Sequence, residues 1–514
     1  MSQTRRVFLE TTALAGAALP AGDDAILIDP QPLFEISPWL YMQFMEPLGI
    51  TDSSVEAAWD YDANDWRKDL VATTRDLAPG ALRVGGIFCR YYKWREGVGP
   101  VKSRPLMRNY VWGGLETNRV GTHEFVDFCR RVGAEPFYCV NFLSDGIRRF
   151  WNTPEGNRSG DAREAADWVS YCNDPDNRER RSHGVRDPYN LKLWQIGNET
   201  SYGTAGFNKD ESIARTIEFA KAMKERDPSI QLIGWGDWQR RAERDFWAGD
   251  LVDRAGSHLD YVAIHLMGQQ PVRKDTVLRG LRYQAAPQQA WEELLELSDN
   301  VEKKLSGLEE VLAARRSGIP VAVTEGHLSI SPHNANPVLH EWLSAAYHAR
   351  SMNIYQRHGA RVKIATGADF CGNRWTVNAV MMQVPRGVSY LMPVGCIMRL
   401  FKRHNGRHAV VVRSAPGALD VAASHSGDRI FLHVLNTSFS RSVQATFAVQ
   451  GRRLFGGRVF EIAPDIPREY VNQDQPEVFT PREKPLPAGP ELRWSFPPTS
   501  VSAVELDLMP ASAA

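Results

Sequence analysis

The sequence predicts an α/β protein in which a (β/α)8 TIM barrel is followed by a C-terminal β-sandwich domain. Between residues 40 and 370, eight short apolar runs alternate with longer segments of helical period. Eight such repeats over about 330 residues are typical of a closed barrel, whereas the alternative, an open doubly wound sheet, usually has fewer. From about residue 395 the helical pattern gives way to short segments rich in β-branched residues, which favours a sandwich.

The eight runs predicted as barrel strands are 40–45, 81–86, 136–142, 191–197, 231–236, 261–266, 320–324 and 363–370. Helices are expected between them. Residues 211–227 place Ile213, Ile217 and Ala220 at i, i+4 and i+7, and Pro228 ends that pattern. A second charged helical stretch, residues 287–317, ends at Gly318.

The segments predicted as sandwich strands are 408–413, 419–423, 430–435, 443–449, 459–462 and 501–508. Residues 464–490 are rich in proline, which indicates an ordered loop or a linker. Residues 24–37 precede the first barrel strand and are expected to add a strand to the sandwich. The predicted domains are therefore the barrel over 38–392 and the sandwich over 24–37 and 393–514.

The N-terminus is similar to a twin-arginine export signal over residues 1–22. Arg5 and Arg6 precede a stretch of small and apolar residues, and this order is what the twin-arginine route recognises. A weakly basic tail is the alternative. If the segment is a signal, the mature protein is periplasmic or secreted.

The composition and motifs of the chain limit the classes of partner and cofactor that we expect it to bind. The 514 residues contain 61 Lys plus Arg and 61 Asp plus Glu, a balance that argues against bulk attraction to nucleic acid or to an anionic membrane. No apolar run is long enough for a membrane span. The early strands are not followed by a Gly-x-Gly-x-x-Gly turn, which argues against a nicotinamide cofactor, and the His and Cys spacing predicts no metal site. We therefore expect neither cofactor nor metal.

Two glutamates stand where barrel enzymes carry their chemistry. Glu199 follows the fourth predicted strand and Glu325 follows the seventh. Catalytic groups of such barrels lie at the C-terminal ends of the strands, and strands four and seven face each other across the barrel mouth. Two carboxylates on either side of a bound sugar are what glycoside hydrolysis requires. Each glutamate on its own could equally cap the element that follows it.

Five separated stretches carry a more specific signal: 41–49, with Glu46 before a proline; 82–100, with Arg83 and Gly85-Gly86; 116–142, with Asn141; 171–199, ending in Gly197-Asn198-Glu199; and 497–501. In these stretches the chain resembles glycoside hydrolase family 51, the α-L-arabinofuranosidases, within a clan of retaining barrel glycosidases. The likeness is strongest between residues 81 and 199. It implies a carbohydrate substrate, an oligosaccharide or polysaccharide, and a homo-oligomer.

By this resemblance, Glu199 is the general acid/base and Glu325 is the nucleophile. The resemblance also implies that Arg83 holds Glu325 ionised, that Asn198 binds the sugar 2-hydroxyl and that Glu46 grips further hydroxyls. Asn141 and His265 are expected to contact the sugar because they end strands three and six. For His265 a buried structural role is the alternative. Trp94 and Trp112 are expected either to stack on the sugar or to pack the loops.

Three departures from the family pattern bear on specificity. Ile87 stands where the second-strand motif has Asn, Leu266 follows His265 where Tyr is usual, and Gly326-His327 follows the nucleophile where Trp is usual. The resemblance therefore indicates the class of reaction more firmly than it indicates which sugar is the substrate. The alternatives are another activity of the clan, such as a β-galactofuranosidase, a xylosidase or an endoglucanase, and a catalytically silent carbohydrate-binding barrel.

Overall fold

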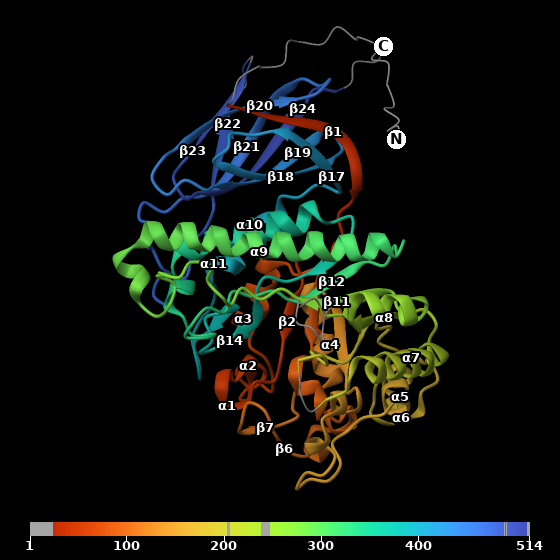
Figure 1. Cartoon of the computed structure of the whole chain (residues 1–514). Coiled ribbons are helices and arrows are strands. Elements are labelled where there is room, and N and C mark those ends of the chain that lie inside the picture. The colour runs from red at the N-terminus through yellow and green to blue at the C-terminus, as the bar shows by residue number, and fades with distance from the viewer. Residues whose placement is uncertain (1–23, 203–205, 238–246, 488, 490, 511–514) are drawn as a thin grey trace, which may run out of the picture.

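The computed structural model describes residues 24–202, 206–237, 247–487, 489 and 491–510, so the predicted export signal lies outside the described residues. A barrel of parallel strands forms one half of the molecule and a β-sandwich forms the other (Figure 1). In the described part of the chain, no helix combines the length and apolarity needed to cross a membrane.

The barrel closes through eight strand positions, as predicted. Every neighbouring pair around the ring is parallel. The strands are β2 (Gln43–Met45), β5 (Ala81–Val84), β8 (Glu135–Val140), β9 (Leu193–Ile196), β10 (Gln231–Trp235), β11 (Tyr261–His265), β12 (Val321–Glu325), β13 (Val362–Ala365) and β14 (Asp369–Gly372).

The eighth position differs from the single strand predicted at 363–370. It is divided between β13, which pairs with β12, and β14, which pairs with β2. At the break, the Thr366 hydroxyl donates to the carbonyl of Ala368 at 2.8 Å. The ring still closes, because the amide of Met42 donates to the carbonyl of Ala365 at 2.9 Å.

Amphipathic helices cover the barrel. α4 (Thr122–Val132) buries Phe125, Phe128, Cys129 and Val132, whose spacing of three to four residues forms one helical face. The predicted helix at 211–227 is α7 (Lys209–Arg226), which begins where the Asn208 side chain accepts from the Glu211 amide. The other long helices are α3 (Lys68–Leu77), α5 (Ala162–Asn173), α8 (Trp247–Ala255), α9 (Pro287–Ala314), α10 (Ala345–Arg357) and α11 (Pro393–Arg403).

Short elements occupy the loops between the barrel strands and helices. They include α1 (Gly49–Asp52), α2 (Ser54–Ala58), β3 (Trp59–Asp60), β4 (Asp65–Trp66), η1 (Gly86–Arg90), β6 (Met107–Arg108), β7 (Leu115–Glu116), η4 (Leu143–Gly146), α6 (Arg178–Ser182), β15 (Asn378–Met382) and β16 (Ser389–Leu391). Those that follow β2, β5 and β8 surround the C-terminal ends of the strands.

The sandwich is a nine-stranded sheet curled around its own apolar core. Its strands are β1 (Ala25–Glu35), β17 (His408–Ser414), β18 (Leu419–Ser426), β19 (Arg429–Asn436), β20 (Val443–Val449), β21 (Leu454–Ile462), β22 (Arg482–Leu486), β23 (Leu492–Phe496) and β24 (Val501–Leu508). The N-terminal strand β1 lies between β17, with which it is antiparallel, and β20, with which it is parallel. Two strands, β22 and β23, lie in segments that were not predicted as strands.

The start of the second domain needs a correction. The sequence places it at residue 393, but residues 393–403 form α11, which packs on α10, α3 and β15 of the barrel half. The sandwich strands after α11 begin at His408.

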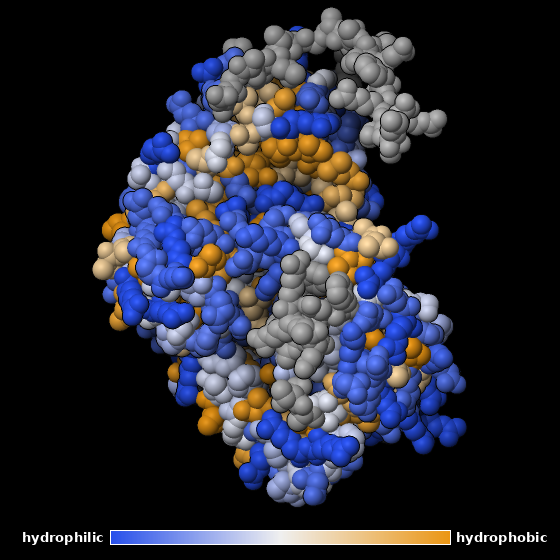
Figure 2. Space-filling model, viewed as in Figure 1, coloured by the Kyte–Doolittle hydropathy of each residue, from blue (hydrophilic) through white to orange (hydrophobic). Residues whose placement is uncertain are grey.

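Helices α9 and α10 lie between the barrel strands and the sandwich (Figure 1). The indole of Trp291 on α9 donates to the carbonyl of Thr437 in the sandwich at 2.8 Å. The proline-rich segment also returns to the barrel half, where the Trp342 amide donates to the Glu469 carbonyl at 2.8 Å. Figure 2 shows hydrophilic residues over the outer face of α9 and a gathering of hydrophobic residues where β1 runs along the sandwich.

Candidate active site

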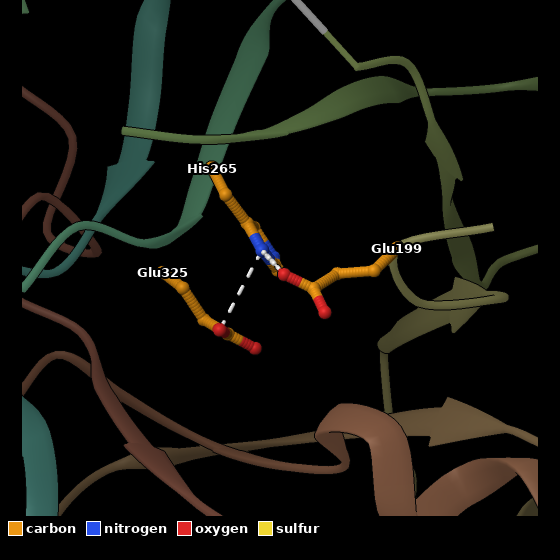
Figure 3. Close-up of side chains that lie close together, drawn as sticks. All are labelled: Glu199, His265 and Glu325. Carbon is orange, nitrogen blue, oxygen red and sulfur yellow. Dashed lines mark hydrogen bonds and ion pairs between the residues drawn. The ribbon is translucent and has the colours of Figure 1, made fainter. Parts of the chain in front are cut away.

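Three side chains from different barrel strands meet at the C-terminal ends of those strands (Figure 3). Glu325 is the last residue of β12, His265 is the last residue of β11, and Glu199 lies three residues beyond the end of β9. His265 Nδ1 lies 3.0 Å from Glu199 Oε1 and 3.5 Å from Glu325 Oε2. One ligand atom of each residue lies within 4.8 Å of the others, and all three side chains are buried. The two carboxylates therefore converge on one imidazole.

The surroundings of His265 fix the orientation of its ring. Its Nε2 lies 3.1 Å from the hydroxyl of Thr324, and its ring meets the Trp235 ring edge-to-face at 4.5 Å. An ionised carboxylate can only accept a hydrogen bond. We therefore assign a proton of His265 to Nδ1, which donates to Glu199.

Arg83 on β5 connects the two glutamate-bearing strands. Its side chain has no exposed surface, and its guanidinium donates to Glu325 Oε1 at 3.2 Å, to Asn198 Oδ1 and to Gln195 Oε1 at 3.0 Å. Arg83 therefore aims the Glu325 carboxylate and holds the carbonyl end of the Asn198 amide. Among the described residues the Asn198 Nδ2 is buried and has no acceptor.

The two carboxyl groups have different pKa values because their partners differ. Burial raises the pKa of Glu325 to about 7; the charge of Glu199 adds to this rise, while His265 and Arg83 oppose it. Burial also works to raise the pKa of Glu199, but the hydrogen bond and charge of His265, with Arg90 and Arg83, outweigh it and leave that pKa below its usual value. The pair therefore holds one proton, on Glu325, at pH values below about 7, and Glu199 is ionised there.

Glu46, which follows β2, is a third buried carboxyl group at the site. Its Oε1 accepts from the Phe88 amide at 2.7 Å and from the Trp112 indole at 3.1 Å. Burial raises the pKa of Glu46 to about 8. Gly86 has a φ of +78°, and a Cβ there would lie 2.3 Å from Glu46 Oε2. The Gly-Gly pair of the second strand thus leaves room for this carboxyl group.

Of the two roles expected for Trp94, the contacts in the structure favour packing of the loops over a sugar contact. The Trp94 ring is 2% exposed, it stacks on Trp168 at 6.0 Å, and its indole donates to the Glu164 carbonyl at 3.0 Å. Both partners belong to α5, so the ring packs a loop against that helix and offers no free face. Trp112, the other tryptophan considered, contacts Glu46 and meets the Trp375 ring at 5.3 Å.

Asn141 ends strand β8 as predicted, but its amide is taken up by the loops. Its Nδ2 donates to the carbonyls of Tyr92 and Arg158 at 3.2 and 2.8 Å, and its Oδ1 accepts from the Ser144 amide at 3.0 Å. These contacts hold the segments after β5 and β8 together. The expected sugar contact is therefore replaced by a structural role.

Two charged pairs at the site were not predicted. His327, two residues after Glu325, lies 2.9 Å from Asp369 on β14. Burial works to lower the pKa of His327, but the charge of Asp369 outweighs it and holds that pKa above its usual value. Arg90 lies 2.7 Å from Asp145 beneath the turn that carries Glu199. Neither pair follows a sequence motif; only the strand-end position of His327 pointed towards the site.

Glu199, His265 and Glu325 form the one group among the described residues that could offer three metal-ligand atoms. Arg83 lies 3.2 Å from Glu325, and the Nδ1 proton assigned to His265 points at Glu199. A cation between these groups would meet the guanidinium charge and would have to displace that proton. The arrangement favours proton transfer and nucleophilic attack over metal chemistry.

The raised pKa of Glu46 predicts a pH-dependent stability. Its unfolded value is about 4.3, so the folded state binds the proton more tightly, and this stabilisation is lost as the pH rises towards about 8. We expect the free energy of unfolding of the wild type to fall between about pH 5 and about pH 8 by on the order of 1 kcal/mol more than that of Glu46→Gln. Urea unfolding followed by tryptophan fluorescence measures this difference. Parallel pH curves for the two proteins would contradict the prediction.

Comparison with known proteins bears on the same region. Residues 73–282 match the family model described as "Alpha-L-arabinofuranosidase 1 domain". An intracellular exo-α-(1→5)-L-arabinofuranosidase of Halalkalibacterium halodurans is 35% identical over 242 residues, 45% of each chain. A probable α-L-arabinofuranosidase C of Aspergillus fumigatus is 34% identical over 212 residues, 39% of this chain and 38% of that protein. The matched stretches thus span less than half the length of these relatives.

The fold is shared over a much longer stretch. The structure of a thermostable GH51 α-L-arabinofuranosidase from Thermotoga petrophila superposes with a TM-score of 0.77 at 24% identity and covers 94% of this chain and 100% of that one. The barrel-plus-sandwich architecture predicted from the sequence is therefore correct. Together, the family model over residues 73–282, the named relatives and the shared fold confirm the resemblance of this chain to glycoside hydrolase family 51.

Proposed function

We propose that this chain is a retaining glycoside hydrolase, an exo-acting α-L-arabinofuranosidase that removes side chains from plant or microbial polysaccharides by double displacement. One observation carries the proposal. Two buried carboxylates from opposite sides of the barrel meet at one imidazole, with ligand atoms within 4.8 Å of one another. Retaining glycosidases hold their carboxyl groups about 5–5.5 Å apart, whereas inverting enzymes leave room for a water between them.

In the first step Glu325 attacks the anomeric carbon while Glu199 protonates the departing glycosidic oxygen. The bond from the anomeric carbon to the leaving oxygen breaks, a bond to Glu325 forms, and the leaving group departs as an alcohol. In the second step Glu199, now ionised, takes a proton from water, whose oxygen attacks the same carbon and releases Glu325. The sugar leaves with its original anomeric configuration.

The pKa order in the unliganded site is the reverse of what the first step requires, so the proton has to move from Glu325 to Glu199 when the substrate binds. Positive charge developing at the anomeric carbon favours the ionised form of Glu325. The shared proton then belongs on Glu199, next to the leaving oxygen.

Sugar recognition rests on a separate set of groups. The free Nδ2 of Asn198 is placed to donate to the sugar 2-hydroxyl, and Glu46 offers its second carboxyl oxygen. Ile87, Leu266 and Gly326-His327 stand where the family pattern has Asn, Tyr and Trp, and His327 pairs with Asp369 on β14. This difference favours, as a second candidate, another activity of the clan, a β-galactofuranosidase, a xylosidase or an endoglucanase. A screen of aryl furanosides and pyranosides, with product stereochemistry followed by proton NMR, distinguishes the candidates.

A catalytically silent carbohydrate-binding barrel is the alternative from another class. Such a protein has no need of two buried carboxylates, one of them paired with a guanidinium that has no exposed surface, and burying these charges costs stability. The same screen tests this alternative, because a silent barrel turns over no glycoside. The homo-oligomer implied by the family resemblance stays a prediction.

Replacing Glu325 tests the nucleophile. We expect Glu325→Ala to lower kcat by about 10⁴-fold or more, because no covalent glycosyl-enzyme can form. Azide should then restore turnover of an activated aryl glycoside and yield a glycosyl azide of inverted configuration, detectable by NMR. Near wild-type rates without azide would assign the nucleophile to another residue.

Replacing Glu199 tests the proton donor. We expect Glu199→Ala to lower kcat/KM by about 10²- to 10⁴-fold for leaving groups of high pKa, and far less for dinitrophenyl glycosides, whose departure needs no proton. Rates on a series of aryl glycosides measure this dependence. Equal losses across the series would contradict the assignment.

We also propose that residues 1–22 direct export through the twin-arginine route, on the strength of Arg5 and Arg6 before the apolar stretch. The relative from Halalkalibacterium halodurans is named intracellular, so the proposal separates this chain from that protein. Replacing Arg5 and Arg6 together by Lys should retain the protein inside a bacterial host that exports the parent chain, as measured by cell fractionation. Equal export of both proteins would contradict it.

A further inference from the structure

The turn that carries Glu199 has a strained backbone. Gly197 and Glu199 both have positive φ angles, +75° and +53°. A non-glycine residue in the left-handed region costs free energy, and such a conformation persists only where surrounding contacts hold it. The groups that hold this turn therefore set where the Glu199 carboxyl group lies.

The carbonyl groups of the turn are held by buried side chains from β8, β9 and η1. Gly197 O accepts from Gln195 Nε2 at 2.8 Å and from the Cys139 thiol at 3.4 Å. Arg90 Nη2, at the end of η1, donates to Asn198 O at 3.1 Å and to Glu199 O at 3.3 Å. Among the described residues, Arg90 is the one side chain that donates to the backbone carbonyls of both Asn198 and Glu199.

Arg90 is itself fixed by Asp145 in η4. Its Nε donates to Asp145 Oδ2 at 2.7 Å, and the Thr200 hydroxyl donates to Asp145 Oδ1 at 3.0 Å. Asp145 therefore grips the turn from its far end as well as holding the guanidinium. Arg90 is 8% exposed and Asp145 is 1% exposed, so water does not replace these contacts.

We propose that Arg90 and Asp145 are positioning residues, a buried pair that holds the strained turn and thereby sets the Glu199 carboxyl group in line with the leaving oxygen. The inference rests on the proposed function of Glu199 as proton donor. Neither residue touches the sugar. Their loss misplaces Glu199 and leaves Glu325 on Arg83 undisturbed, so it weakens proton donation selectively. A displacement of about 1 Å at a catalytic group can cost on the order of 10²-fold in rate.

The experiment compares Arg90→Lys with Arg158→Lys, a matched control. Arg158 is also a buried arginine, 4% exposed, and it donates to both oxygens of Glu96 and to the Tyr91 carbonyl. In both variants lysine keeps the charge and loses the planar fork. The readout is kcat/KM on a series of aryl glycosides with leaving groups of increasing pKa, alongside the melting temperature. Glu199→Ala serves as the reference for lost proton donation.

We expect Arg90→Lys to lower kcat/KM by on the order of 10- to 100-fold for poor leaving groups and by about threefold or less for activated ones. For Arg158→Lys we expect kcat/KM to depend on leaving-group pKa as in the wild type, at a similar loss of melting temperature. Asp145→Asn and Thr200→Val should show the same pattern as Arg90→Lys, and they carry the test if Arg90→Lys does not fold. This inference alone is overturned if kcat/KM depends steeply on leaving-group pKa in Glu199→Ala but follows the wild-type dependence in Arg90→Lys and Asp145→Asn. An equally steep series for Arg158→Lys also overturns it. A flat series for Glu199→Ala overturns the proposed function, and this inference with it.

Discussion

The site depends on one guanidinium that has no contact with water. Arg83 points from β5 across the barrel and is surrounded by acceptors from β9 and β12. A buried charge costs several kcal/mol unless it is paired and hydrogen-bonded, so these acceptors cannot move away from it independently. Strands that are far apart in sequence are therefore held at fixed separations at the point where the two glutamates project.

This constraint also explains the uneven ionisation of the site. Arg83 contacts Glu325 directly, yet Glu325 has the raised pKa, because its burial and the nearby charge of Glu199 outweigh one guanidinium. Glu199 has a lowered pKa because His265 adds a hydrogen bond of 3.0 Å and Arg90 adds a second positive charge. In the unliganded site a proton bound by the pair therefore resides on Glu325, and Glu199 is ionised.

The sequence predicted the barrel well because parallel strands buried on both faces read as uninterrupted apolar runs. It also predicted that Glu199 and Glu325 follow strands four and seven. The sequence could not show which partners a side chain takes once its place on a strand or loop is known. Asn141 ends its strand as expected, but its amide is used by its own loops, and the apolar ring of Trp94 fits a loop core as well as it would fit a sugar.

Arg90 shows a different limit of sequence reasoning. In the sequence it is a cation in a loop, which usually means a solvated side chain. Its burial depends on Asp145, on a separate loop, and on carbonyl groups of a turn more distant still. Backbone carbonyls have no sequence signature, so neither spacing nor composition could reveal them as partners. The interruption of the eighth strand and the assignment of α11 to the barrel half are likewise set by tertiary contacts.

Chemistry and specificity therefore lie on different residues of the same strand ends. The groups that would move protons and electrons, Glu199, His265 and Glu325, are locked by Arg83 and by the Arg90–Asp145 pair. The positions that depart from the family pattern, Ile87, Leu266 and His327, lie outside these contacts, one to four residues further along their strands or loops. Under the proposed function, side-chain substitutions at these positions change which sugar hydroxyls find a partner, and an unpaired hydroxyl discriminates strongly between sugars. The proposed substrate can then diverge while the two carboxylates and their charged partners are kept.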